Sequence, residues 1–186
     1  MELNTKDRSF ESIQTPRLSV MSITKVHLQD ILHEKNSEQV NRYLAAKSAN
    51  SLDELAKRID GIMEKNQAKE IIQLEVIAQE NNEFIWLCAI KKPNSGHPEI
   101  WLWIKKWAQW KGYGKELVEW LVDRIRCHLT YEYIIYETFE DNVWSVKIIE
   151  SLWWVKQPEI EPKENYYGET LPHVQYRIYP WQHAAT

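Results

Sequence analysis

Two glycines stand between a strand-like segment and a helix-like segment, and this junction limits the fold more than any other feature of the chain. The hexapeptide Gln109–Gly114 follows the apolar segment 99–104 and precedes a stretch, about Lys115 to Arg126, whose apolar residues recur at helical spacing. Glycines let the connecting turn point its backbone N–H groups outward. The helix start adds unpaired N–H donors and the positive end of the helix dipole. The junction therefore predicts a strand–turn–helix unit with an anion site, most often one for phosphate.

Apolar periodicity divides the rest of the chain into strands and helices. Strands are predicted at 17–23, 71–79, 84–91, 99–104, 133–139, 153–155 and 173–179, and helices at about 24–34, 39–47, 115–126 and 142–152. Thr24 is expected to cap the first helix, and Ser51 opens a further helix through its capping-box spacing to Glu54. Residues 1–12 are expected to be loose, and the section between the last two strands is expected to be a loop. This order predicts one α/β domain over residues 1–186, with a mixed sheet rather than a doubly wound one.

Charge, hydropathy and cysteine use exclude several classes of protein. The 186 residues carry a formal net charge of −4, so we expect no nucleic-acid partner and no anionic-membrane partner. No apolar run approaches the roughly 20 residues of a membrane span, and the polar N-terminus shows no signal peptide. Cys88 and Cys127 lack metal or redox spacing, so we expect both to be buried thiols in a reducing compartment, the cytoplasm. The ten tryptophans are interpreted mainly as core residues, with pocket lining as the alternative.

The glycine hexapeptide differs from two common phosphate motifs. It lacks the Gly-x4-Gly-Lys-Ser/Thr pattern, so no hydroxyl is placed for Mg²⁺. It also lacks Gly-x-Gly-x-x-Gly, which argues against dinucleotides. Taken alone, the hexapeptide is a weak signal, and an ordinary β–α turn is the preferred interpretation.

Four motifs in the right order resemble the GNAT N-acetyltransferases, and in particular their ribosomal-protein (RimJ/RimL-like) branch. Ile13–Leu18 resembles the opening "T-x-R-L" strand, and Lys111–Leu117 resembles the branch's "G-K-G-Y-A-T-E-A-L" stretch. Asn142–Ser145 matches an "N-x-x-S" helix start, and Glu164–Gly168 matches a late "E-x-x-x-G" loop. The resemblance spans about residues 13–178. It implies the GNAT fold, an α+β arrangement with a mixed, mostly antiparallel central sheet flanked by helices.

The resemblance also implies acetyl-CoA as co-substrate, with no metal, and transfer of its acetyl group to a primary amine by direct attack. The pantetheine arm would bind the strand backbone before the loop, the pyrophosphate would bind backbone N–H groups of the loop, and the two loop lysines would add charge. The implied contacts are Leu102, Trp103, Ile104, Gln109, Trp110, Lys111, Gly112, Tyr113, Gly114, Lys115, Asn142 and Ser145. An ordinary solvated side chain is the alternative for each lysine.

Three glutamates are alternative candidates for the base that removes the amine proton. The resemblance nominates Glu164, in the late loop. Glu137 comes second because it precedes Asn142 by five residues, where other N-terminal acetyltransferases of the family carry a glutamate, and Glu99 comes third. The resemblance makes Ser145 the hydrogen-bond donor to the leaving thiolate. Helix capping is the alternative role for Asn142 and Ser145, since both residue types favour helix N-termini.

The chain also departs from the family pattern. Ile149 replaces the tyrosine acid that many members carry seven residues after the asparagine, Trp153-Trp154 replaces "G-F", Trp110 replaces a glycine, and Met21 replaces an arginine. In a left-handed turn, a tryptophan at 153 would cost about 1–2 kcal/mol. A silent CoA-binding module and transfer of a longer acyl group therefore remain alternatives. The acceptor can be a protein N-terminus, an antibiotic, a polyamine or another small amine. The sequence does not distinguish a monomer from a homodimer. We expect substrate to enter between the early helices and the late loop, past Trp101, Trp103 and Trp107.

Overall fold

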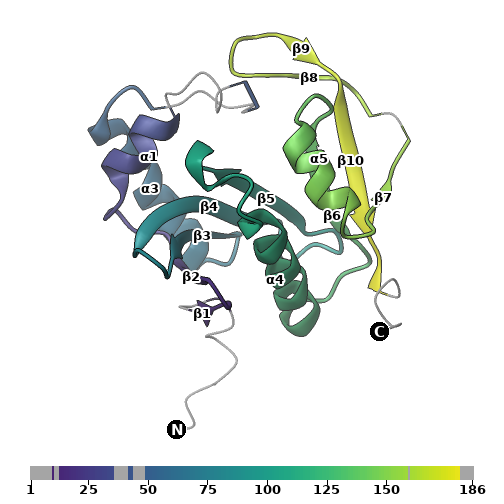
Figure 1. Ribbon diagram of the computed structural model, residues 1–186, viewed down its shortest axis with the longest axis horizontal. Coiled ribbons are helices and arrows are strands. Elements are labelled where there is room, and N and C mark those ends of the chain that lie inside the picture. The colour runs from purple at the N-terminus through teal and green to yellow at the C-terminus, as the bar shows by residue number, and fades with distance from the viewer. Residues whose placement is uncertain (1–9, 11–12, 36–41, 44–48, 159, 181–186) are drawn as a thin grey trace, which may run out of the picture.

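The computed structural model describes residues 10, 13–35, 42–43, 49–158 and 160–180, which form an eight-stranded sheet with helices on both faces (Figure 1). Every neighbouring pair of strands is antiparallel except β5 and β6, which confirms the mixed, mostly antiparallel sheet. In sheet order the strands are β1 (Ile13–Gln14), β2 (Leu18–Ser22), β3 (Ile71–Ala78), β4 (Glu83–Lys91), β5 (Glu99–Ile104), β6 (Ile134–Phe139), β10 (His173–Ile178) and β7 (Val155–Lys156).

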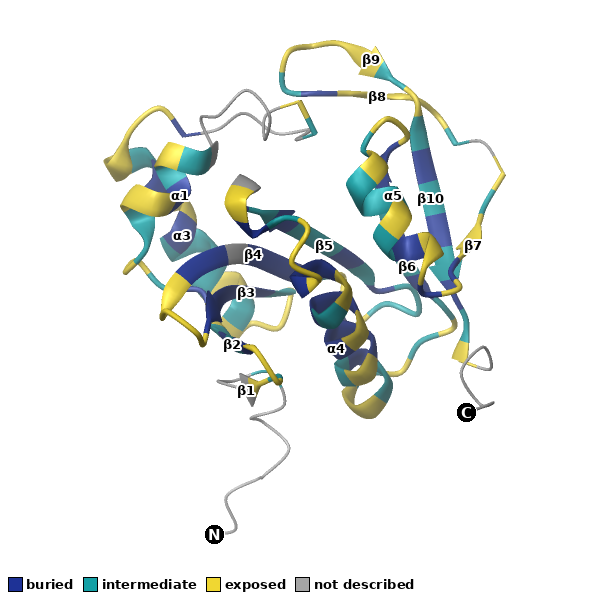
Figure 2. Cartoon of the chain, in the orientation of Figure 1, coloured by how far each residue is buried: buried dark blue, intermediate teal, exposed yellow. Residues whose placement is uncertain are grey.

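The helices cover both faces because strand side chains alternate between two buried clusters. The helices are α1 (Leu28–Lys35), α3 (Leu52–Gln67), α4 (Tyr113–His128) and α5 (Val143–Glu150), with a short 3₁₀ turn η2 (Lys106–Ala108) before the glycine loop. Leu117 of α4 and Ile149 of α5 join one cluster, and Ile31 of α1 and Ile59 of α3 join the other. Figure 2 shows this alternation along β10 as dark blue and teal bands.

Several predicted elements are confirmed because their signals are local. Ser51 is the N-cap of α3, and its side chain accepts a hydrogen bond from the Glu54 backbone N–H. The predicted stripe of α4, Leu117, Leu121, Val122 and Ile125, is buried throughout. β3, β4 and β5 lie within one residue of their predicted limits. The local period of apolar residues is therefore sufficient to place the centre of the molecule.

Other predictions are wrong at their boundaries. Thr24 does not cap α1, which begins only at Leu28, because its hydroxyl instead accepts from the Val26 N–H and donates to Glu75. The predicted late loop contains a hairpin of β8 (Lys163–Glu164) and β9 (Thr170–Leu171). Trp153 precedes β7 instead of joining it. The predicted helix at 39–47 and the loose segment 1–12 lie outside the described residues, apart from residues 42–43 and residue 10.

Two further details concern cysteine and tryptophan. Cys88 is buried, which raises the pKa of its thiol, but Cys127 is exposed, so the expectation of two buried thiols is wrong. Cys127 lies in the last turn of α4, where its side chain points to solvent. Trp110 and Trp153, which stand where the family has glycine, both adopt the left-handed backbone that glycine favours, with φ of 73° and 62°. No helix in the described part of the chain combines the length and apolarity needed to cross a bilayer.

The parallel contact between β5 and β6 is short. Among the described residues, β5 pairs with β6 only through Glu99–Ile135 and Ile100–Tyr136. β4, by contrast, pairs with β5 along its whole length, from Lys91–Glu99 to Trp86–Ile104. Residues 101–104 of β5 therefore have one edge in the sheet and one edge facing the gap that opens towards the end of β6.

Candidate active site

A cavity of about 1020 Å³ occupies the gap where β5 and β6 diverge. Its walls come from β5, β6, the glycine loop, α5, α1, β8 and β10. Leu102, Trp103 and Ile104, the strand residues expected to hold the pantetheine arm, all line it. The cavity therefore contains a strand edge that the sheet itself does not use.

Strand alternation gives this cavity two sides. Leu102 and Ile104 point to the α4–α5 face, and Tyr136 of β6 is buried there as well. Trp101 and Trp103 point to the α1–α3 face. Glu137 also points away from α5, because it follows Tyr136 in the strand. The cavity can therefore hold one ligand on its α4–α5 side and a second ligand on its α1–α3 side. The two ligands would meet where β5 and β6 diverge.

The glycine loop forms one end of the cavity. Gly112, with φ of 79°, is the N-cap of α4 and has no side chain to cover the helix start. Backbone N–H groups of the first turn, from Tyr113 to Lys115, consequently keep their donors for a ligand. Gln109, Trp110, Gly112, Gly114 and Lys115 line the cavity here. This end can bind an anion through backbone donors, the helix dipole and one lysine.

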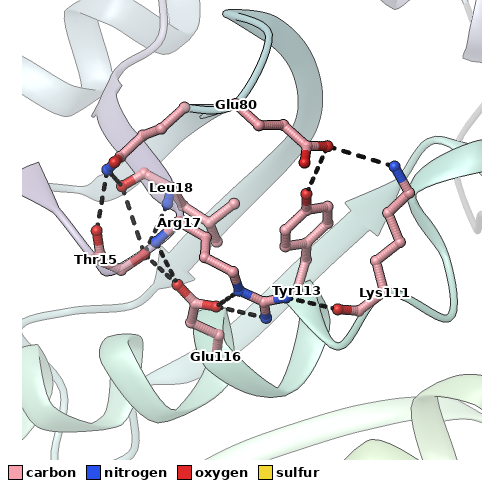
Figure 3. A network of polar contacts seen from close by, with 8 residues as sticks. Thr15, Arg17, Leu18, Glu80, Lys111, Tyr113 and Glu116 are labelled. Carbon is pink, nitrogen blue, oxygen red and sulfur yellow. Dashed lines mark hydrogen bonds and ion pairs between the residues drawn. The ribbon is translucent and has the colours of Figure 1, made fainter.

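A polar network holds the loop in place from behind (Figure 3). Arg17, from the "T-x-R-L" motif, donates through Nε to Glu116 (2.7 Å) and through Nη1 to the Lys111 carbonyl (2.8 Å). The Thr15 hydroxyl and the Arg17 N–H also donate to Glu116. Tyr113 donates to Glu80 at 3.1 Å, and its ring lies under the Arg17 guanidinium at 4.7 Å. The opening motif therefore supports the loop through contacts 94 and 99 residues apart in the chain.

The Glu116 carboxyl is the centre of this network. Burial alone would raise the pKa of Glu116, but the hydrogen bonds from Thr15 and Arg17 outweigh burial and lower that pKa below its ordinary value. Lys111 directs its side chain to Glu80 and over the Trp107 ring, on the same side as Tyr113 (Figure 3). Neither Lys111 nor Tyr113 lines the cavity, so only their backbone groups remain as predicted contacts.

Ser145 lies on the wall made by α5, beside a tyrosine. Asn142 is the N-cap of α5 and accepts from the Ser145 N–H, so the capping role is present in this structure. The Tyr136 hydroxyl donates to Ser145 Oγ at 3.3 Å, and burial raises the pKa of Tyr136 to about 12. With its oxygen already accepting, Ser145 can donate its own proton into the cavity. Tyr136 was not predicted as a site residue, because its alternation within a strand marks it only as core.

Two of the three candidate glutamates line the opposite side. Glu137 accepts from Lys163 at 2.5 Å and from Gln175 at 2.7 Å, and Glu99 accepts from Lys91 at 2.6 Å. Burial alone would raise the pKa of Glu137, but the bonds from Lys163 and Gln175 outweigh it and lower that pKa. Glu164 is exposed and does not line the cavity, because the two-residue period of β8 turns Lys163 inward and Glu164 outward.

The structure adds His173, which was absent from the predicted site. It begins β10, lines the cavity, and has a side chain only 7% exposed. Its Nδ1 is enclosed without a hydrogen bond among the described residues, 3.9 Å from a Glu137 oxygen. Burial and the Lys163 charge lower the pKa of His173. In the sequence, His173 is only the first residue of a predicted strand, which gives no indication that it belongs to a site.

The remaining predicted residues divide plainly. Trp101 and Trp103 line the cavity, whereas Trp107 does not. Ile149 is buried in the core, so α5 offers no phenol at that position. Glu34 of α1 and Lys163 of β8 also line the cavity, and the predicted substrate route between the early helices and the late loop stays a prediction. Within the described residues, no group of three His, Cys, Asp or Glu side chains is arranged to hold a metal ion.

Known acetyltransferases resemble this chain in sequence pattern and in fold. Residues 17–152 match the family model of the acetyltransferase (GNAT) domain. Ribosomal-protein-S5-alanine acetyltransferase from Vibrio fischeri aligns at 14% identity and a TM-score of 0.80, over 92% of this chain and 97% of that chain. RimL, a ribosomal L7/L12 α-N-protein acetyltransferase solved with coenzyme A, aligns at 14% identity and 0.78, over 91% and 98%. The microcin C7 self-immunity acetyltransferase MccE, solved with acetyl-CoA and AMP, aligns at 12% identity and 0.75, over 89% and 93%. A sequence search of curated proteins found no match.

Proposed function

Because the chain belongs to the GNAT acetyltransferase family, we propose that it transfers the acetyl group of acetyl-CoA to a primary amine. The observation that carries this proposal is the free edge of β5, which lies in the same cavity as the uncapped start of α4. An extended amide-containing arm ending in a pyrophosphate matches both features at once. The arm would pair with the strand, and the pyrophosphate would bind the helix start.

The outer part of CoA would lie against an aromatic and basic surface. Trp110 and Trp144 line the cavity in edge-to-face contact, and the Lys147 ammonium lies 5.5 Å from the Trp144 ring centre. Lys115 lines the same end. Aromatic rings stack on a purine, and lysines neutralise phosphates. This surface supports the CoA orientation in which the thioester points to the divergence of the strands.

The reaction would be direct attack on the thioester carbonyl. The acceptor would approach from the side of Trp101 and Glu137, and a backbone N–H of residues 102–104 would stabilise the oxyanion of the tetrahedral intermediate. The thiolate would leave on the α5 side, where Ser145 would donate its proton. Tyr136 would fix the orientation of the Ser145 hydroxyl through its hydrogen bond.

The acceptor belongs to one of two groups of amines. The name of RimL gives its substrate as the α-amine of a ribosomal protein. An α-amine has a pKa near 8, whereas a lysine side chain has a pKa of about 10.4. An α-amine therefore loses its proton more easily, which favours a protein N-terminus over a lysine side chain. A small-molecule amine is the second group. With Cys127 exposed as a free thiol, we place the enzyme in a reducing compartment, the cytoplasm.

Two measurements on the full chain test the proposal. Acetyl-CoA at one hundred times its Kd should stabilise the fold by about 2.7 kcal/mol, which raises the Tm by about 5–11 °C. Thiol release should then depend on an amine from a panel of N-terminal peptides and small amines, with the N-acetyl product seen by mass spectrometry. Stabilisation without turnover would favour a silent CoA-binding module. Faster turnover with longer thioesters would favour a longer acyl group, and no stabilisation by any CoA thioester would refute CoA binding altogether.

A further inference from the structure

We propose that His173 is the catalytic base that takes the proton from the acceptor amine, an assignment that rests on the proposed acetyl transfer. His173 lies on the acceptor side of the cavity, at the end of β10 that pairs with Phe139. The side chain is 7% exposed and packs edge-to-face on the Phe139 ring, with centroids 5.2 Å apart. A polar ring held this firmly beside the cavity is placed to meet a ligand.

The two ring nitrogens have different surroundings. Nδ1 is enclosed, makes no hydrogen bond among the described residues, and lies 3.9 Å from a Glu137 oxygen. A carboxylate on that side favours the tautomer with the proton on Nδ1. The lone pair then resides on Nε2, which would take the proton of the bound amine.

The glutamates on the same wall are weaker candidates because they are already neutralised. Glu137 is held by Lys163 and Gln175, and Glu99 by Lys91. The hydrogen bonds that hold Glu137 also lower its pKa, which makes its carboxylate a weaker base than an ordinary one. His173, by contrast, has no hydrogen bond to its Nδ1 and no ion pair shorter than 3.9 Å among the described residues.

The charges around His173 keep it neutral at pH 7. Burial lowers its pKa most and Lys163 of β8 lowers it further. Glu137 of β6 and Glu99 of β5 act in the opposite direction, and Lys91 of β4 again lowers it. The net effect is a pKa below the ordinary value of 6.5, so the ring has a free lone pair at neutral pH. An imidazole of this kind matches the requirement for a base near the operating pH.

The proton count closes for the whole reaction. Nε2 takes one proton from the acceptor ammonium, and the freed nitrogen lone pair forms a C–N bond to the thioester carbon. When the intermediate collapses, the C–S bond breaks, and the second nitrogen proton reaches the thiolate through the Ser145 hydroxyl. The products are the N-acetyl amine and CoA thiol, and the imidazolium returns its proton to water.

The test compares His173→Gln with His33→Gln, the same change at an exposed position of α1 outside the cavity. We expect His173→Gln to lower kcat at least 100-fold at pH 7, with the Kd of acetyl-CoA within threefold of wild type, and His33→Gln to match wild type. The wild-type pH profile of kcat/KM should fall below a pKa under 6.5, and this limb should be absent from the residual activity of His173→Gln. Imidazole should partly restore turnover by His173→Ala.

Glu137→Gln separates the imidazole from the carboxylate. If His173 is the base, Glu137→Gln loses only the support for the Nδ1–H tautomer, so it keeps at least ten times the kcat of His173→Gln. Its acid limb moves to lower pH, because a negative charge near the ring has been removed. Loss of activity in Glu137→Gln with retention in His173→Gln would overturn the assignment and leave the acetyl transfer standing. An unchanged acid limb in His173→Gln would do the same. Absence of turnover by the wild type on the whole amine panel would instead refute the proposed function, and the assignment with it.

Discussion

Substitution of Glu116 by glutamine should loosen the glycine loop from behind, since Glu116 itself does not line the cavity. The change preserves the size of the side chain but removes the charge on which Thr15 and Arg17 converge, at distances from 2.5 to 3.1 Å. Hydrogen bonds to a charged group contribute about 1.5–3 kcal/mol when buried. The Glu116 side chain is 16% exposed but that of Arg17 is 48% exposed, so solvent screening reduces the effect. We expect a loss of about 2 kcal/mol, or a Tm lower by about 4–8 °C.

The same substitution should affect co-substrate binding more than chemistry. Arg17 holds the Lys111 carbonyl, so a displaced guanidinium releases the backbone that would cradle the pyrophosphate. Titration calorimetry should show acetyl-CoA binding weakened about 3- to 10-fold, or about 0.7–1.4 kcal/mol, with kcat at saturation changed less than twofold. Asp123→Asn, on the same helix with a side chain 70% exposed, is the matched control and should shift Tm by less than about 2 °C.

The stabilisation that Glu116 contributes should depend on pH. Because the pKa of Glu116 is lowered in the folded protein, its stabilisation is complete above the ordinary glutamate pKa of about 4.3 and is lost as pH falls through the lower folded value. The difference in Tm between wild type and Glu116→Gln should therefore be constant from pH 7 to about 5 and shrink at more acid pH. A Tm within 1 °C of wild type at pH 7, together with an unchanged Kd, would show that the network does not support the loop.

Three further substitutions test other parts of the site. Ser145→Ala should lower kcat about 10- to 100-fold with the Kd of acetyl-CoA within threefold, measured by thiol release and calorimetry; an unchanged kcat would remove Ser145 from the reaction. Gly112→Ala should cost about 1–2 kcal/mol through its φ of 79°, since the added methyl would lie at an ordinary 3.5 Å from Arg17; an unchanged denaturation midpoint would contradict this. Trp153→Gly should raise the Tm by about 2–4 °C by relieving a φ of 62°, whereas a lower Tm would mean that contacts of the indole outweigh the backbone strain.

Elements of this fold can be predicted from the sequence where their signal is local, and not where they depend on contacts with distant segments. α4 and β3–β5 follow from apolar periods within one element, and Ser51 reveals the start of α3 because the capping residues are three apart. α1 begins later than its capping signal predicts, because the Thr24 hydroxyl donates instead to Glu75, 51 residues away. The β8–β9 hairpin was missed because its strands are two residues long and mostly exposed.

The site shows the same division. The backbone cradle at Gly112 could be predicted, because it requires only a glycine between a strand and a helix. The choice among the glutamates could not, since the side of β8 that faces the cavity depends on how the hairpin docks. His173 and Tyr136 become visible as site residues only when β10 and β6 are paired and their faces are assigned.

The two-rung contact between β5 and β6 makes the molecule a sheet of two halves joined by a narrow seam. If a pantetheine arm lies along the free edge of β5, its amides form hydrogen bonds with the β5 backbone where β6 does not pair with it. The co-substrate then occupies part of the gap between the two strands. Each such bond contributes about 0.5–1.5 kcal/mol, so the liganded protein should open along the seam less often than the free protein. Amide hydrogen exchange in residues 101–104 should then slow on binding CoA, and each turnover would end with the seam exposed again as CoA leaves.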